Sequence, residues 1–233
     1  MDDLTLLYYT SNRIQEPTGE RIRQHLLETT RGEIPLISVS QKIMNFRINI
    51  CVNNIGVSKY NIYKQIYIGL NYIKTPYVAC CEDDVLYNYE HFTHRPEKGV
   101  FAYDCNMWFA EQDEFWRRPV EDDTDALRRR SGMFGCIVEK DTLLQYLNKK
   151  FLKYPEPDSN NYDWGEPRSK VEYFSGKLPL VVFIHYDSNN GRRQIQKRKL
   201  LERHKRESLP EDHTKNIELY GDITTVWKKY YEI

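Results

Sequence analysis

The sequence predicts an α/β protein built on a mostly parallel sheet that is flanked by helices. Two observations predict this fold class, and a third feature fits the way such sheets bind ligands. Short apolar runs typical of buried strands alternate with amphipathic runs typical of helices. Their spacing fits strand–helix–strand crossover units, which build parallel sheets. Acidic and polar residues gather where apolar runs end, and such sheets bind ligands at the carboxyl ends of their strands.

Composition limits the classes of protein that fit. With 233 residues, 40% hydrophobic and 29% charged, the chain is long enough to bury a core and is typical of soluble globular proteins. Its formal net charge is zero, so any electrostatic function must come from local clusters. The five cysteines form neither a regular framework nor a CxxC metal pattern, which favours reduced thiols in a cytoplasmic protein.

The N-terminus does not look like a targeting signal. "MDDLTLLYYT" places acids before a short apolar run, the opposite of a secretory signal. No segment approaches the roughly 18 apolar residues that a membrane helix needs. We therefore expect no membrane insertion.

The first third of the chain has the clearest periodicity. We expect strands at 4–10, 34–40, 48–54 and 76–81, and helices at 20–30 and 56–73. In the second helix, Ser58 is a candidate cap, and Tyr63, Ile66, Tyr67 and Leu70 share one face.

The rest of the chain is less regular. We expect a strand or hairpin at 99–110, a charged loop with some helix at 111–130, a strand and then a helix within 135–152, a turn-rich loop at 154–167 and a buried strand at 178–187. Residues 192–206 follow with eight Lys or Arg against one Glu. This basic tract is either a solvated helix face or a patch that binds anions.

The stretch "YVACCEDDVLY" carries the main chemical signal. The apolar run Tyr77–Cys81 ends in Glu82, Asp83 and Asp84. Three adjacent carboxylates repel one another, so packing gives little reason for them, whereas Mg²⁺ and Mn²⁺ prefer such oxygen ligands. In extended backbone Glu82 and Asp84 would point to one side and Asp83 to the other. The alternative is a solvated acidic turn paired with arginines, and the acids alone leave both interpretations open.

The segment "NNIGVSKYNIYKQ", followed by "TPYVACCEDDVLY", resembles the nucleotide-sugar half of GT-A glycosyltransferases, which have a Rossmann-type sheet. Gly56, Lys59 and Asn61 match the G-x-x-x-[RK]-x-N start of a helix in that family. The three acids occupy the position of its DxD motif, with Glu82 in place of the first Asp. The opening "LYYTSNR" is similar to the first strand and nucleotide-base loop. The resemblance covers residues 4–86 well and extends more loosely to 187.

This resemblance implies roles for particular residues. Asp84 would coordinate Mn²⁺ or Mg²⁺ bridging the diphosphate of a UDP-type sugar donor, and Glu82 or Asp83 would bind the ribose or a metal-bound water. His185 would complete the metal site, unless it is a strand-edge histidine that bonds a backbone carbonyl. The other implied donor-binding residues are Thr10, Asn12, Arg13 and Lys59.

The resemblance also implies an acceptor side. "YDWGEP" is an imperfect match to the family's base motif, with Glu166 as the first choice of general base and Asp163 as the second. Arg192 and Arg193 could neutralise the donor diphosphate, and the basic tract could hold a polyanionic acceptor such as DNA. Small cytoplasmic enzymes of this type occur among viral proteins that glycosylate hydroxymethylated pyrimidines in DNA.

We therefore expect a catalytic domain at 1–187, with a donor half at 1–86 and an acceptor half at 87–187, and a C-terminal basic helical extension at 188–233. We expect it in the cytoplasm of a bacterium or a virus-infected host cell. The leading function is metal-dependent sugar transfer to a hydroxyl, either in hydroxymethylated DNA or in a surface-glycan precursor. The alternatives are a nucleotidyltransferase, although the chain has no glycine-rich phosphate loop, and a nucleic-acid-binding protein without sugar transfer.

Overall fold

The computed structural model describes residues 1–111, 114–117, 132–157, 167, 170–183 and 212–231. The chain forms two compact units. The first contains Met1–Asn106 and Ser131–Leu180, and the second contains Met107–Arg130 and Val181–Ile233. These units follow spatial contacts, and the functional boundary expected at residue 187 stays a prediction.

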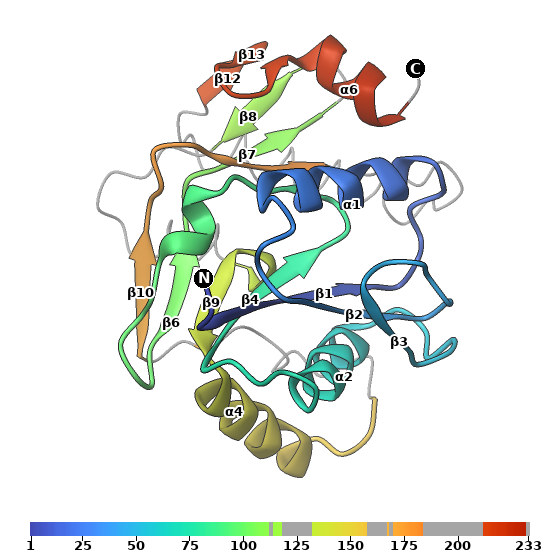
Figure 1. Ribbon diagram of the computed structural model, residues 1–233, viewed down its shortest axis with the longest axis vertical. Coiled ribbons are helices and arrows are strands. Elements are labelled where there is room, and N and C mark those ends of the chain that lie inside the picture. The colour runs from blue at the N-terminus through green and yellow to red at the C-terminus, as the bar shows by residue number, and fades with distance from the viewer. Residues whose placement is uncertain (112–113, 118–131, 158–166, 168–169, 184–211, 232–233) are drawn as a thin grey trace, which may run out of the picture. The chain divides into compact units, whose positions relative to one another are not determined.

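The first unit carries most of the regular structure (Figure 1). Its elements in chain order are β1 (Leu4–Thr10), α1 (Thr18–Thr29), β2 (Leu36–Ser40), β3 (Ile48–Cys51), α2 (Lys59–Leu70), β4 (Tyr77–Glu82), β5 (Val85–Leu86), the 3-10 turn η1 (Glu90–Thr93), β6 (Phe101–Asp104), the 3-10 turn η2 (Met133–Gly135), β9 (Cys136–Glu139), α4 (Lys140–Lys153) and β10 (Val171–Phe174).

Seven strands of this unit form one sheet in the order β10-β6-β9-β4-β1-β2-β3. Strand β1 is parallel to β2 and β4, β2 is parallel to β3, and β6 is parallel to β10. Only β9 among these strands runs antiparallel to its neighbours, β4 and β6. Helix α1 covers one face, and α2 and α4 cover the other (Figure 1). The predicted fold class is confirmed. The order of the strands reverses between β1 and β4, which is where open α/β sheets bind ligands.

Helix α2 forms for the reasons that its sequence indicates. The Ser58 side chain caps it by accepting a hydrogen bond from the Asn61 backbone N–H at 3.1 Å. Tyr63, Ile66 and Leu70 are buried and Tyr67 is partly buried in the cluster under the sheet, as predicted. Gly69 allows close approach, because an added Cβ would overlap Leu7 Cδ1 and lie 3.0 Å from Val39 Cγ2.

Strands β2 and β3 are parallel although only residues 41–47 join them and no helix lies between. This return segment must run back along the sheet, because parallel strands need a crossover. Asn49 holds it: its Nδ2 donates to Ser38 Oγ and Ser40 Oγ at 2.9 and 2.8 Å, and its Oδ1 accepts from Met44 N at 3.1 Å. The Ser38 hydroxyl donates to Phe46 O at 2.9 Å.

The second unit contains strands of a second sheet and a short helix. Its elements are β7 (Met107–Ala110), β8 (Phe115–Arg117), β11 (Leu180–Phe183), β12 (Asp212–Thr214), β13 (Asn216–Ile217), β14 (Gly221–Asp222) and α6 (Ile223–Tyr231). Strands β12, β8, β7 and β11 are neighbours in that order. The Trp227 ring lies 5.4 Å from Phe183, and its Nε1 donates to Glu111 O at 2.5 Å.

The structure differs from two of the predicted elements. The run 99–110 forms two strands, β6 and β7, which belong to different sheets. The described end of the expected helical extension, residues 212–231, contains three short strands as well as α6. Within the described residues, no helix is both long enough and apolar enough to cross a membrane.

Candidate active site

The predicted acids lie at the carboxyl edge of the sheet, beside the end of β1. In the parallel register, Tyr9 is opposite Glu82, so the residues that follow both strands meet at one place. Asp83 and Asp84 form the turn between β4 and β5. This is the point at which the strand order reverses, so topology alone makes it the expected ligand crevice.

Hydroxyl groups hold two of the three acids. The Tyr9 hydroxyl donates to Glu82 Oε1 at 2.8 Å, and the Thr10 hydroxyl donates to Asp83 Oδ2. The Glu82 backbone N–H donates to the Tyr87 hydroxyl at 3.0 Å, which in turn donates to Phe134 O at 2.9 Å. These bonds fix the turn and orient the carboxylates, as supporting hydrogen bonds do in metal sites.

Asp84 differs from the other two acids. Its Oδ1 is shielded from solvent and has no hydrogen-bond partner in the described part of the chain. Burial raises the pKa of Asp84 well above its ordinary value, and repulsion from Glu82 and Asp83 raises it further. Burial also raises the pKa of Asp83, against the lowering effect of the Thr10 hydrogen bond. At Asp84, burial and the two neighbouring acids therefore outweigh the opposing effect of Arg13, which lowers its pKa.

A cavity opens beside these acids. Its empty volume is about 470 Å³, which includes open solvent at its mouth. Five residues predicted for the site line it, namely Thr10, Arg13, Glu82, Asp83 and Asp84. The lining also contains polar residues to which the sequence analysis assigned no site role, among them Tyr9, Gln41, Asn61 and Gln65.

The wall opposite the acids is built by side chains that bond to backbone groups. Gln41 Nε2 donates to Gly56 O at 2.8 Å, and Gly56 N donates back to Gln41 Oε1 at 3.2 Å. Asn61 Nδ2 donates to Ile55 O at 2.5 Å. Gly56 has φ +82°, a conformation that side chains disfavour. Gly56 and Asn61 of the family motif therefore shape the loop at the start of α2.

Gln65 joins this wall to the sheet. It is 2% exposed, and its Nε2 donates to Thr10 O at 2.8 Å and to Val39 O at 3.1 Å. A glutamine beside the apolar face of a helix is a signal that the sequence contained. It could have been found by asking where the amide would find its partners.

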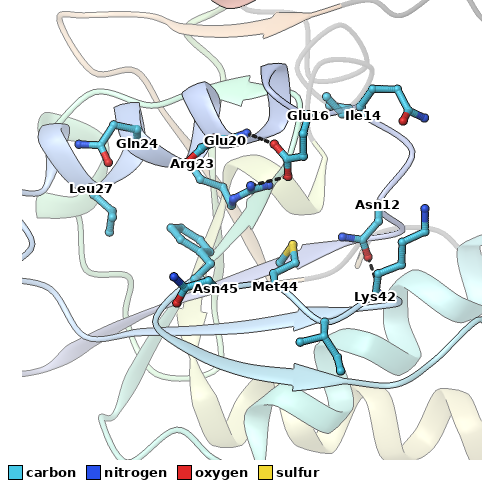
Figure 2. Close-up of a pocket in the computed structure, with 13 residues that line it drawn as sticks. Asn12, Ile14, Glu16, Glu20, Arg23, Gln24, Leu27, Lys42, Met44 and Asn45 are labelled. Atoms are coloured by element: carbon cyan, nitrogen blue, oxygen red, sulfur yellow. Dashed lines mark hydrogen bonds and ion pairs between the residues drawn. The ribbon is translucent and has the colours of Figure 1, made fainter.

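Asn12 and Lys59 are placed differently from the other predicted donor-binding residues. Asn12 lines a neighbouring cavity (Figure 2). Its Oδ1 accepts from the backbone N–H groups of Gln41 and Lys42, both at 2.8 Å, and its own N–H donates to Thr10 Oγ1 at 2.8 Å. Lys59 is exposed and does not appear among the residues that line either cavity. Their roles in donor binding stay predictions.

The predicted acceptor base and second metal ligand lie outside the described residues, as do the two arginines expected at the diphosphate. These residues are Asp163, Glu166, His185, Arg192 and Arg193. Among the residues that are described, no three or more His, Cys, Asp or Glu side chains converge as a protein-only metal site would require.

The acids nevertheless fit a divalent cation of the kind that accompanies phosphates. Mg²⁺ and Mn²⁺ often take only one or two protein carboxylates and complete their shells with phosphate oxygens and water. Asp84 offers an oxygen without a partner, and the unfavourable charge that raises its pKa is the condition that a cation relieves. Glu82 and Asp83 are already anchored, so Asp84 is the residue that fits such an ion best.

Comparison with known proteins finds solved structures similar to this one but assigns the chain to no family. No protein-family model matches the sequence, and no curated protein matches it. Several solved structures do match. Staphylococcus aureus TarS 1–349, in complex with UDP-GlcNAc, has a TM-score of 0.46 at 10% identity over 81% of this chain and 61% of that chain.

Two other matches are similarly distant. The bifunctional IspDF from Campylobacter jejuni has a TM-score of 0.41 at 10% identity, over 75% of this chain and 50% of that chain. A glycosyltransferase involved in glycosylation of the major capsid of PBCV-1 has a TM-score of 0.41 at 9% identity, over 84% and 98%. The chain spans 37% of another TarS structure. At identities and TM-scores this low, none of these likenesses assigns an activity to the chain.

Proposed function

We propose that this protein is a metal-dependent glycosyltransferase that moves a sugar from a nucleoside-diphosphate sugar, a UDP-sugar, to a hydroxyl acceptor. The observation that carries the proposal is Asp84, which lines the cavity at the carboxyl ends of β1 and β4 and whose shielded Oδ1 has no partner in the described residues. An enzyme that expels a diphosphate needs a compensating positive charge there, and a carboxylate that lacks one is where a cation would bind.

Asp84 would hold Mn²⁺ or Mg²⁺, with phosphate oxygens and water as the remaining ligands. When bound, the ion supplies charge neutralisation for the departing diphosphate without any proton transfer. The protein's own residues keep the acids in place: Tyr9 fixes Glu82, and Thr10 fixes Asp83. Arg13 lines the same cavity, and its charge would attract the donor's phosphates.

The acceptor hydroxyl must lose its proton as it attacks the sugar, and a carboxylate serves as the general base. Glu166 remains the proposed base, with Asp163 as the second choice. His185 remains a proposed metal ligand, and Arg192 and Arg193 remain proposed partners of the diphosphate. We propose that the acceptor is either a hydroxymethylated pyrimidine in DNA or a surface-glycan precursor. The assay below distinguishes the two by offering both kinds of acceptor.

The test is transfer itself. The purified chain is incubated with a panel of UDP-sugars and Mn²⁺, with hydroxymethylpyrimidine DNA or neutral oligosaccharides as acceptors, and UDP release and acceptor mass are measured. We expect transfer with one donor, loss of transfer on chelation, and loss in Asp84→Asn. The matched control is Asp141→Asn, which neutralises an exposed carboxylate on α4 and should keep activity.

The outcome also separates this class from a nucleotidyltransferase. Such an enzyme would release pyrophosphate from a nucleoside triphosphate in the presence of a sugar phosphate and would transfer no sugar from UDP-sugars. Transfer that survives both chelation and Asp84→Asn would contradict the proposed role of the metal.

A further inference from the structure

A second cavity lies on the α1 face of the sheet (Figure 2). Its empty volume is about 1070 Å³, which includes open solvent. Residues of α1 and of the loop before it form one side, and Lys42–Phe46 of the return segment form the other (Figure 2). None of the three acids of the active site lines this cavity, and the sequence analysis assigned it no function.

The charges around this cavity balance one another. Glu16 and Glu20 contribute two carboxylates, and Arg23 and Lys42 contribute two cations. Arg23 Nη2 bonds Glu16 Oε1 at 2.5 Å, and Glu16 Oε2 accepts from Glu20 N at 2.7 Å. Burial opposes charge on Arg23, but the Glu16 bond and the nearby Tyr8 hydroxyl outweigh it and raise the pKa of Arg23. The lining is therefore neutral and partly fixed.

Several polar groups at this cavity are left available. The lining contains four side-chain amides, those of Asn12, Gln15, Gln24 and Asn45. Both hydrogen bonds of the Asn12 side chain are accepted by its Oδ1 atom, and its Nδ2 group has no partner among the described residues. The side chains of Asn45 and Lys42 also make no hydrogen bond or ion pair within the described residues. These groups are free to bond a ligand.

Apolar surface completes the cavity. Phe46 is 4% exposed and packs edge-on against Tyr8 with ring centroids 5.0 Å apart. The Arg23 guanidinium lies 5.8 Å from the centroid of the same ring. Met44 and Leu27 add aliphatic surface. The cavity thus combines the partly exposed apolar side chains of Leu27 and Met44 with amides that both donate and accept hydrogen bonds.

We propose that this cavity binds a neutral saccharide and holds part of the acceptor. Sugar hydroxyls both donate and accept hydrogen bonds, which amides and a carboxylate–guanidinium pair can match, and the C–H faces of sugars suit apolar side chains. A polyanion such as DNA would require Lys or Arg in excess, whereas Glu16 and Glu20 offset Arg23 and Lys42. The acceptor part of this proposal rests on the proposed glycosyltransferase function.

Proximity to the active site supports the acceptor role. Asn12 lines this cavity, while its neighbours Ser11 and Arg13 line the cavity beside the acids. Gln41 and Lys42 divide between the two cavities in the same way. The loop after β1 and the start of the return segment therefore border both cavities. Transfer requires donor and acceptor to be held side by side.

Binding is tested without nucleotide or metal, so that the result does not depend on the proposed chemistry. Saturation-transfer NMR is recorded on the full chain with maltotetraose, chitotetraose and short single-stranded DNA, each at millimolar concentration. Gln24→Trp places a bulky ring at the exposed edge of the cavity. The matched control is Gln145→Trp at an exposed position of α4. Asn45→Ala is a milder second variant that removes one available amide.

We expect at least one neutral tetrasaccharide to bind. Gln24→Trp should weaken binding about tenfold or more, Asn45→Ala should weaken it less, and Gln145→Trp should leave it unchanged. Melting curves without ligand establish that each variant is folded, and if Gln24→Trp is not folded, Asn45→Ala decides. Absence of saccharide binding, binding of DNA alone, or saccharide binding that no folded cavity variant weakens overturns the proposal. If a saccharide binds but UDP and Mn²⁺ together leave the melting temperature unchanged, this site is kept and the proposed transferase function is rejected.

Discussion

At the scale of single residues, Asp84 is where the sequence departs from what stability favours. A buried carboxylate oxygen without a partner costs free energy, and two adjacent acids increase that cost. Proteins retain such features chiefly at functional sites. The same residue should therefore limit the stability of the ligand-free protein and determine its affinity for a cation.

Replacing Asp84 by Asn should stabilise the ligand-free protein at neutral pH by about 1–3 kcal/mol, because the unfavourable charge is removed. The sign of the pH dependence follows from the raised pKa in the folded state. Wild-type protein should gain stability relative to Asp84→Asn as pH falls through the folded-state pKa toward the ordinary value of 3.8. The measurement is urea unfolding of both proteins from neutral pH to about pH 4.

Asp141→Asn controls for a general charge effect, since Asp141 is exposed. The difference in unfolding free energy between wild type and Asp141→Asn should change little across the same range of pH. A stability loss in Asp84→Asn at neutral pH would show that a partner stabilises this carboxylate in the ligand-free protein, and the carboxylate would then no longer be a vacant ligand for a cation.

Asn12 should matter for stability through its side-chain oxygen. The residue has φ 56°, and its Oδ1 accepts two backbone N–H groups at the start of the return segment. Asn12→Ala removes the acceptor from a left-handed position and should cost about 1–2 kcal/mol. Asn12→Asp keeps an acceptor oxygen, and Asp also tolerates this conformation, so its cost should be smaller. Chemical unfolding measures both, and equal losses would argue against the hydrogen bonds as the cause.

At the scale of elements, Gly69 tests how α2 packs on the sheet. Helix propensity alone predicts that Gly69→Ala stabilises by about 1 kcal/mol. The added Cβ, however, would overlap Leu7 Cδ1 and crowd Val39, so we expect a net loss of about 1–3 kcal/mol. Lys64→Ala, at an exposed position of the same helix, is the control for propensity and should be nearly neutral. A gain in stability for Gly69→Ala would mean that α2 packs less closely on β1.

The elements that could be predicted from the sequence are those specified by local signals. The cap at Ser58 and the periodicity of Tyr63, Ile66 and Leu70 are properties of a short segment, and both were confirmed. The separation of β6 from β7 depends on which distant strand each one pairs with, which short-range patterns do not encode. The same is true of the return segment, because its course follows from the parallel pairing of β2 and β3.

At the scale of the whole molecule, the chain places its chemistry where β1 and β4 end. The acids and their place at a strand end could be predicted, because an apolar run followed by three carboxylates is a local signal. The bonds from Tyr9 to Glu82 and from Thr10 to Asp83 could not, because they join residues 73 positions apart through the register of two strands. Gln41 was missed for the same reason, since its partner Gly56 lies beyond β3.

Two cavities on either side of the loop after β1 give the molecule a simple functional arrangement. Under the two proposals, the cavity at the acids would hold a donor with a diphosphate, and the cavity on the α1 face would hold a saccharide. Asn12 and Gln41, which bond to each other between the two, would set the spacing of the substrates. The donor assignment depends first on a cation held by Asp84.

The most direct test of that claim is thermal melting with UDP and Mn²⁺, separately and together, for wild type, Asp84→Asn and Asp141→Asn. A ligand that binds only the folded state must raise its stability. We expect wild type and Asp141→Asn to gain about 5 °C or more with both ligands, exceeding the sum of the separate shifts. Asp84→Asn should lose this joint gain relative to its own baseline. An equal joint shift in Asp84→Asn, or none in wild type, would contradict a cation site at Asp84.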